Sequence, residues 1–109
     1  MDFIGKTLTA FGLTDKEARV YRAALNHEET SPFELSRETK IPRTTVYEIL
    51  FNLSLKGLIA LVQSDGFSKQ QTRIKAKNPS LLREIVAKKR ADLASLDVDL
   101  VQILPYLKK

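Results

Sequence analysis

Two helix signals separated by a short turn lie in residues 31–58, SPFELSRETKIPRTTVYEILFNLSLKGL. The first helix begins at Ser31, a good N-cap residue, followed by a proline and, three residues on, a glutamate. It is expected to end near Thr39. The second helix opens at Ile41-Pro42 and stops at Gly57, and its apolar residues recur at helical spacing: Val46, Ile49, Leu50 and Leu53. Two helices joined by so short a turn cross steeply, which is the helix-turn-helix arrangement.

Two further helices are expected before this stretch. Residues 3–11 carry a helical apolar stripe that ends at Gly12, a residue suited to a left-handed helix cap. Thr14 is a good N-cap, and Glu17, three residues later, completes a capping box. The second of these helices is expected to run to about His27.

A β-hairpin is expected after Gly57. Residues 58–62 are apolar and include the β-branched Ile59 and Val62, Asp65-Gly66 is a turn signal, and residues 71–76 alternate basic or polar side chains with mainly apolar ones. Three helices followed by a two-stranded hairpin form a winged helix. The predicted fold class is therefore mainly α with a small β-hairpin, and residues 1–77 form a winged helix-turn-helix DNA-binding domain.

A last helix is expected from Asn78-Pro79, so that residues 78–109 form a second part of the chain. Its apolar residues repeat every seven positions, interrupted by Lys89, and a sustained seam of this kind pairs with another helix. We therefore expect a coiled-coil-like homodimer; packing against the first helix of the same chain is the alternative. Pro105 should end or kink the helix near residues 101–104. The predicted interface residues are Leu82, Val86, Leu93, Leu96, Leu100, Ile103 and Leu107.

Phe51 and Leu55 lie nearly opposite the buried stripe of the helix that follows Ile41-Pro42. Two apolar faces on one helix do not fit a surface helix with one exposed side. We expect the last helix or a partner subunit to cover these two side chains, which makes them packing residues rather than ligand residues.

The composition is that of a soluble globular protein: 109 residues, 43% hydrophobic and 28% charged. It has no cysteine, no apolar run long enough for a bilayer and no signal-peptide pattern, so a cytoplasmic protein with no membrane association is expected. The formal net charge is +5, and basic residues are concentrated in residues 40–77, where Glu48 and Asp65 are the acidic ones. Such a field attracts a polyanion; a solvated basic face is the alternative.

The second helix of the helix-turn-helix is the expected DNA reader, because its N-terminal residues reach base edges in this motif. Arg43 suits guanine, the Tyr47 phenol suits a phosphate oxygen, and Glu48 suits a cytosine amine. As alternatives, Glu48 is an ordinary exposed helix residue and Tyr47 packs half-buried against the wing. The predicted DNA-binding residues of this helix are Arg43, Thr44, Thr45, Tyr47 and Glu48.

Three basic residues of the hairpin, Lys69, Arg73 and Lys75, are the expected DNA contacts of the wing. A wing that reaches along the DNA backbone or into a minor groove uses residues of this type. Exposed Lys and Arg on a short ribbon also prevent edge aggregation, and the two roles are compatible.

Residues for catalysis are not recognisable in the sequence. The single histidine, His27, stands at a helix end, and no serine has an identifiable base partner. Metal-ligand spacing and a glycine-rich phosphate loop are also missing. We therefore expect neither enzyme activity nor a cofactor or metal.

Several separated blocks resemble, in order, the N-terminal domain of the TrmB family, transcriptional regulators found mainly in archaea and also in bacteria. The resemblance covers roughly residues 8–80 and implies a winged helix that places its third helix in the major groove. It also implies dimerisation through the C-terminal helix and puts Arg43, Thr44, Thr45 and Tyr47 at DNA-facing positions. The blocks are Gly12-Leu13-Thr14, Glu17-Ala18, Val20-Tyr21, Ala24-Leu25, Ile41-Pro42-Arg43, Val46-Tyr47-Glu48 and Lys56-Gly57-Leu58.

The sequence departs from the family pattern in three respects. Lys40 stands where the turn usually has glycine, and the turn geometry is therefore a point at which a difference from the family is expected. Ile74 stands where an aromatic residue usually follows the wing arginine. The larger family members continue into a sugar-binding effector domain, whereas this sequence ends after the helix, so a sugar response is not carried over and an effector remains unknown.

Together these features predict a sequence-specific transcriptional regulator that binds double-stranded DNA as a homodimer. The alternative function is that of a winged-helix protein–protein interaction module in a larger assembly. Such a module would not need the basic residues that are concentrated around the reader helix and the wing.

Overall fold

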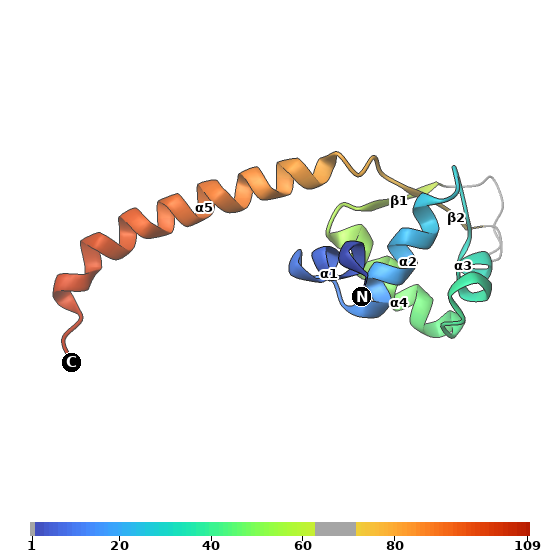
Figure 1. Ribbon diagram of the computed structural model, residues 1–109, viewed down its shortest axis with the longest axis horizontal. Coiled ribbons are helices and arrows are strands. Elements are labelled where there is room, and N and C mark those ends of the chain that lie inside the picture. Colours follow the sequence, from blue (N-terminus) through green and yellow to red (C-terminus); the bar gives the residue numbers. More distant parts are fainter. Residues whose placement is uncertain (1, 63–71) are drawn as a thin grey trace. The chain divides into compact units, whose positions relative to one another are not determined.

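The computed structural model describes residues 2–62 and 72–109. The chain divides into two compact units, Met1–Lys77 and Asn78–Lys109, which are described separately. The predicted fold class, mainly α with a small β-hairpin, is confirmed (Figure 1). The elements of the chain are α1 (Phe3–Ala10), α2 (Asp15–Leu25), α3 (Pro32–Thr39), α4 (Arg43–Leu55), β1 (Ile59–Val62), β2 (Arg73–Ala76), α5 (Leu81–Ile103) and the 3-10 turn η2 (Leu104–Tyr106).

Helix α1 begins at Asp2, whose side chain accepts a hydrogen bond from the Ile4 backbone N–H at 3.2 Å. The same carboxylate is ion-paired with Arg22 of α2, so the cap also ties α1 to the next helix. Desolvation raises the pKa of Asp2, but hydrogen bonds from the Gly5 N–H and the Arg22 guanidinium outweigh it, and the net pKa is lowered.

Helix α2 begins with the predicted capping box. Thr14 Oγ1 accepts from the Glu17 N–H at 3.1 Å, and Glu17 Oε1 accepts from the Thr14 N–H at 2.9 Å. Glu17 is buried, and Lys56 Nζ lies 3.8 Å from its carboxylate, so the buried charge is compensated. The helix ends at Leu25, two residues before the predicted end, because the chain tightens into a turn after it: the His27 N–H bonds to the Ala24 carbonyl.

Helices α3 and α4 form the predicted helix-turn-helix. Ser31 Oγ accepts from the Glu34 N–H at 3.2 Å, and Pro32 is the first residue of α3, as expected from the sequence. The helix ends at Thr39, and Lys40 at its C-terminus has a φ of 60°. The turn therefore keeps the left-handed geometry that glycine adopts at no cost. A lysine at this position is thus compatible with a backbone conformation that favours glycine.

The core of the first unit lies between α2, α3, α4 and the hairpin (Figure 1). The helices contribute side chains at helical spacing, and each strand contributes one buried side chain, Ile59 from β1 and Ile74 from β2. Among the described residues, the largest fully buried side chains are Val20, Tyr21, Thr30, Leu35, Val46, Leu53, Leu58, Ile59 and Ile74. This core sets which face of α4 points outward.

The wing is an antiparallel pair in which Ile59 pairs with Ala76 and Val62 with Arg73. Both strands are shorter than the predicted 58–62 and 71–76, and the predicted turn Asp65-Gly66 lies outside the described residues. An additional bridge, for which the sequence carries no local signal, joins Thr30 and Ile74 through two backbone hydrogen bonds of 2.9 and 2.8 Å. This bridge ties the segment before α3 to the wing.

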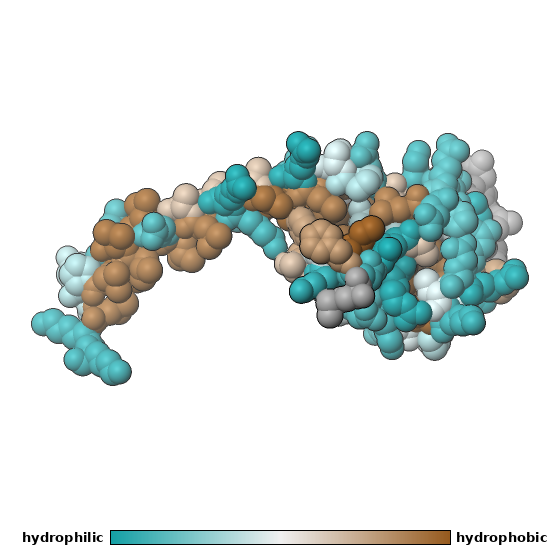
Figure 2. All heavy atoms as spheres, viewed as in Figure 1, coloured by the Kyte–Doolittle hydropathy of each residue, from teal (hydrophilic) through white to brown (hydrophobic). Residues whose placement is uncertain are grey.

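Helix α5 starts after an Asn78 turn, in which the Asn78 side chain accepts from the Ser80 N–H at 2.9 Å. It ends at Ile103, two residues before Pro105, which confirms the predicted effect of that proline. None of its residues is buried, and Figure 2 shows hydrophobic side chains along much of its surface. Among the described residues, no helix combines the length and apolarity required to cross a membrane.

Candidate nucleic-acid interface

The first turns of α4 present polar side chains to the surface. Since Val46, Ile49 and Leu50 are buried, the opposite side of the helix must face outward. Arg43, Thr44, Tyr47 and Glu48 are exposed, and Thr45 is half-buried, so all five predicted reader residues lie at this end of the helix without being part of the core.

The start of α4 is also electrostatically suited to an anion. Pro42 precedes the helix and provides no side-chain cap, and the first turn contains no acidic residue. The free N–H groups and the helix dipole therefore carry a partial positive charge that Arg43 reinforces.

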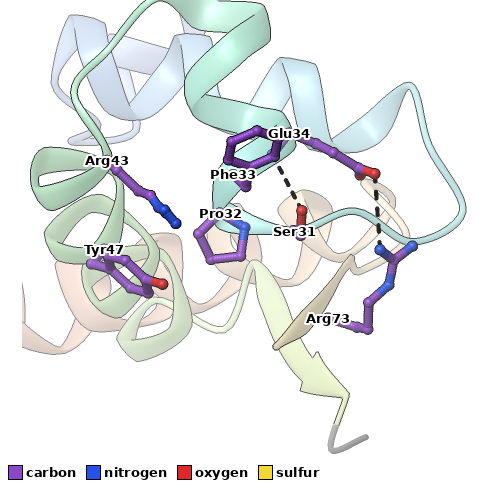
Figure 3. A pocket seen from close by; sticks show the side chains of 7 residues that line it. All are labelled: Ser31, Pro32, Phe33, Glu34, Arg43, Tyr47 and Arg73. Atoms are coloured by element: carbon purple, nitrogen blue, oxygen red, sulfur yellow. Dashed lines mark hydrogen bonds and ion pairs between the residues drawn. The ribbon is translucent and has the colours of Figure 1, made fainter. Parts of the chain in front are cut away.

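A hollow of about 540 Å³ joins the start of α3, the start of α4 and strand β2 (Figure 3). Arg43 and Tyr47 reach into it from α4, and Arg73 stands on its wing side. Residues far apart in the sequence thus form one surface, whose lining residues are Ser31, Pro32, Phe33, Glu34, Arg43, Tyr47 and Arg73.

The Phe33 ring lies within cation–π distance of two arginines. The guanidinium carbon of Arg43 is 5.5 Å from the ring centroid, and that of Arg37 is 5.7 Å from it. Neither Phe33 nor Arg37 was among the predicted site residues. Their spacing of four residues on one helix was the available signal, because residues at i and i+4 are neighbours on a helix surface. The approach of Arg43 depends on how α3 and α4 cross.

Arg73 of the wing is held by carboxylates. Its Nε is 3.7 Å from Glu29 Oε2, and its Nη1 is 4.0 Å from Glu34 Oε1. Glu34 is in turn oriented by the Thr30 hydroxyl, which donates to Glu34 Oε2 at 3.0 Å. Arg73 therefore links β2 to the segment around the start of α3, a role that the charge pattern did not reveal.

Of the other two predicted wing residues, Lys75 and Lys69, the structure describes Lys75. Lys75 is exposed on β2 and forms no ion pair among the residues that the structure describes. Lys69, the third predicted wing residue, lies outside the described residues.

His27 forms a short contact with Glu38, with 2.6 Å between Nε2 and Oε1. This pair joins the end of α2 to α3 at the surface. Within residues 2–62 and 72–109, no cluster of histidine and acidic side chains is arranged to hold a metal ion.

The predicted interface residues of the C-terminal part are exposed or half-buried, and no residue of α5 is buried. Val98, Val101 and Leu104, outside the predicted seam, are also exposed, so the apolar surface of this segment is broader than one seam. In the first unit, Phe51 and Leu55 are 65% and 71% exposed. No described element of that unit covers them, and their cover by the last helix or a partner stays a prediction.

A helix-turn-helix followed by a hairpin wing defines a winged helix-turn-helix protein, a DNA-binding fold. The family model "Sugar-specific transcriptional regulator TrmB" matches residues 8–80. The chain belongs to this family of transcriptional regulators, and the resemblance seen in the sequence is confirmed.

Solved structures share the fold at low sequence identity. A possible transcriptional regulator from Methanosarcina mazei Go1 is 21% identical with a TM-score of 0.65, and the match covers 93% of this chain and 84% of that one. The archaeal chromatin protein TrmBL2 is 18% identical with a TM-score of 0.62, over 97% of this chain but 44% of its own. A MarR family regulator from Neisseria meningitidis is 13% identical with a TM-score of 0.56, over 95% and 87% of the two chains. No curated protein matches the sequence.

Proposed function

We propose that the protein is a sequence-specific regulator that binds double-stranded DNA as a homodimer, with α4 in the major groove. The observation that carries the proposal is the first turn of α4, where exposed Arg43, Thr44 and Tyr47 accompany a positive, uncapped helix start. Membership of a family of transcriptional regulators supports it, and that family gives no reason to assign a catalytic step.

The residues divide between base reading and backbone contact. Arg43 has the planar fork that pairs with the O6 and N7 atoms of guanine, and Glu48 is an acceptor for a cytosine amine. The hydroxyls of Thr44, Thr45 and Tyr47 suit phosphate oxygens, which fix the position of the helix without reading sequence. Lys69, Arg73 and Lys75 are proposed to contact the backbone from the wing.

The homodimer is proposed to form through the apolar residues of the C-terminal part. Exposed leucines repeating over several turns of a 23-residue helix are costly in water, and a second copy of the helix would bury them. Two reader helices related by a two-fold axis fit successive major grooves when they lie about 34–36 Å apart, or a multiple of that. The preferred site is then an inverted repeat with half-site centres about 10 base pairs apart, or near 20.

The test is selection of bound sequences from a random duplex pool, followed by footprinting of the selected site. We expect one two-fold symmetric protected site per dimer. Arg43→Ala should cost about 1–3 kcal/mol at that site and relax the base preference. The control is Lys16→Ala, which removes an exposed positive charge from α2 and should leave the preference unchanged.

The competing function is a winged-helix protein-interaction module. It would be favoured if the protein showed no salt-dependent retention on duplex DNA, because phosphate neutralisation always produces such a dependence. Protection of a single asymmetric half-site would keep a DNA-binding domain but contradict the dimeric operator.

A further inference from the structure

We propose that Phe33 holds Arg37 and Arg43 as a pair of cations, and that Arg37 is a further residue of the DNA interface, binding a backbone phosphate. The inference rests on the proposed function and adds a phosphate contact on α3. It also assigns Phe33 as a positioning residue for both arginines.

The geometry comes from two helices that meet at one ring. Phe33 and Arg37 lie four residues apart on α3, whereas Arg43 reaches the ring from the first turn of α4, as Figure 3 shows for Phe33 and Arg43. The two guanidinium carbons lie 5.7 and 5.5 Å from the ring centroid. Phe33 remains 52% exposed, so its ring is available at the surface instead of being buried in the core.

The neighbouring carboxylates are directed at other partners. Glu34 is paired with Arg73 and accepts from the Thr30 hydroxyl, and Glu38 contacts His27 at 2.6 Å. In the part of the chain that the structure describes, neither Arg37 nor Arg43 has a carboxylate within ion-pair distance. Two positive charges near one ring are thus left without a protein anion.

A DNA phosphate is the anion that fits this place. The first helix of a helix-turn-helix crosses the nucleic-acid backbone while the second enters the groove. Arg37 is exposed on that first helix, and a guanidinium binds phosphate oxygens through two parallel N–H donors. Arg43, on the second helix, is left to read a base. The shared ring limits the conformations of both arginine side chains.

The first experiment measures binding of the full chain to its selected duplex over a range of salt concentrations. Arg37→Ala should weaken binding about 3- to 10-fold, and the slope of log affinity against log salt should fall by about one for each phosphate that the variant no longer neutralises. The base preference should remain that of the parent. Lys16→Ala is the control for removal of one positive charge, and unchanged thermal unfolding shows that the fold is kept.

The second experiment distinguishes the effect of the aromatic face of Phe33 from the effect of its apolar volume. Phe33→Tyr keeps an aromatic face and should bind like the parent, whereas Phe33→Leu keeps apolar volume without that face. The leucine variant should bind about 2- to 5-fold more weakly for each cation–π interaction that it removes, with a relaxed preference at the base that Arg43 reads.

Three results are decisive. If Arg37→Ala keeps the affinity and salt slope of the parent while Arg43→Ala relaxes the preference, the inference is wrong and the proposed function stands. If Phe33→Leu binds like the parent, the ring does not position the arginines. If the parent itself shows no salt-dependent duplex binding, the proposed function fails before the variants are compared.

Discussion

Lys40, in the turn between α3 and α4, has a left-handed backbone conformation that is unfavourable for any residue other than glycine. Its φ of 60° is the only left-handed value of a non-glycine residue in residues 2–62 and 72–109. The side chain is exposed, so its packing does not repay this cost. Hydrogen bonds of Thr39 stabilise the turn: its hydroxyl accepts from the Ile41 N–H at 3.3 Å and donates to the Leu35 carbonyl at 2.7 Å.

Lys40→Gly should therefore stabilise the protein. Relief of the left-handed strain is worth about 1–2 kcal/mol, and the extra backbone entropy of glycine offsets about 0.5–1 kcal/mol. We expect the free energy of unfolding in urea to rise by about 1 kcal/mol. Lys40→Ala removes the same charge but keeps a Cβ, so it should show no such gain. Equal stabilisation by both variants would assign the effect to charge instead of backbone strain.

The buried hydroxyl of Tyr21 is a second feature that lowers the free energy of unfolding. Its side chain is 1% exposed, and its hydroxyl has no hydrogen-bond partner among the described residues. An unsatisfied buried hydroxyl costs about 1–3 kcal/mol relative to water. Burial also raises the pKa of Tyr21 above its ordinary value of 10.0.

Tyr21→Phe should thus keep or raise the free energy of unfolding at pH 7 and alter its pH dependence. Since the pKa of Tyr21 is raised on folding, the unfolded state ionises first, and stability is lost as the pH rises above about 10. The phenylalanine variant lacks this contribution and should lose less stability as the pH is raised through about 10. Urea unfolding at equal protein concentration measures both effects, and parallel losses in parent and variant would contradict the assignment.

At the scale of elements, the wing is attached to the helix-turn-helix in two ways. The Thr30–Ile74 bridge supplies two backbone hydrogen bonds, and Arg73 supplies ion pairs to Glu29 and Glu34. All three ionic side chains are partly exposed, so the pairs are each worth at most about 1 kcal/mol of stability. Their larger effect is expected on binding, because the two carboxylates compete with phosphate for Arg73.

Glu34→Gln should strengthen duplex binding about 2- to 5-fold at low salt and steepen the salt slope, because it removes one of the two carboxylates that compete with phosphate for Arg73. Glu28→Gln is a matched control from the neighbouring loop, since Glu28 forms no ion pair in the described part of the chain. Identical behaviour of the two variants would mean that the pairing with Arg73 has no consequence for binding.

At the scale of the whole molecule, the apolar surface of the C-terminal part is broader than the predicted seam, so variants of seam residues can be compared with variants of their apolar neighbours. Aspartates at both Leu96 and Leu100 would bury two charges in the proposed interface, at a cost that no contact at its rim offsets. We expect a folded monomer in sedimentation, or loss of helical signal if pairing and folding are coupled. Aspartates at Val98 and Val101 add the same charge outside the seam and should leave the dimer intact. The opposite ranking would place the interface on the other side of the helix.

Helix starts and ends could be predicted from the sequence because they depend on residues a few positions apart. The capping box of Thr14 and Glu17, the Ser31-Pro32 start of α3 and the stop before Pro105 all follow from local hydrogen bonds and sterics. The heptad pattern of α5 is equally local, whereas the partner that buries its apolar residues is not encoded by local spacing. Fold class and family followed from the order of these signals.

Contacts between segments distant in the chain required the tertiary structure. The crossing of α3 and α4 brings Arg43 to Phe33, and the Thr30–Ile74 bridge brings Arg73 to Glu29 and Glu34. No periodicity encodes such meetings, because they depend on how packed elements are oriented around a shared core. The charge of Arg73 was therefore readable from the sequence, but its partners were decided only by the packing of the wing against the helix-turn-helix.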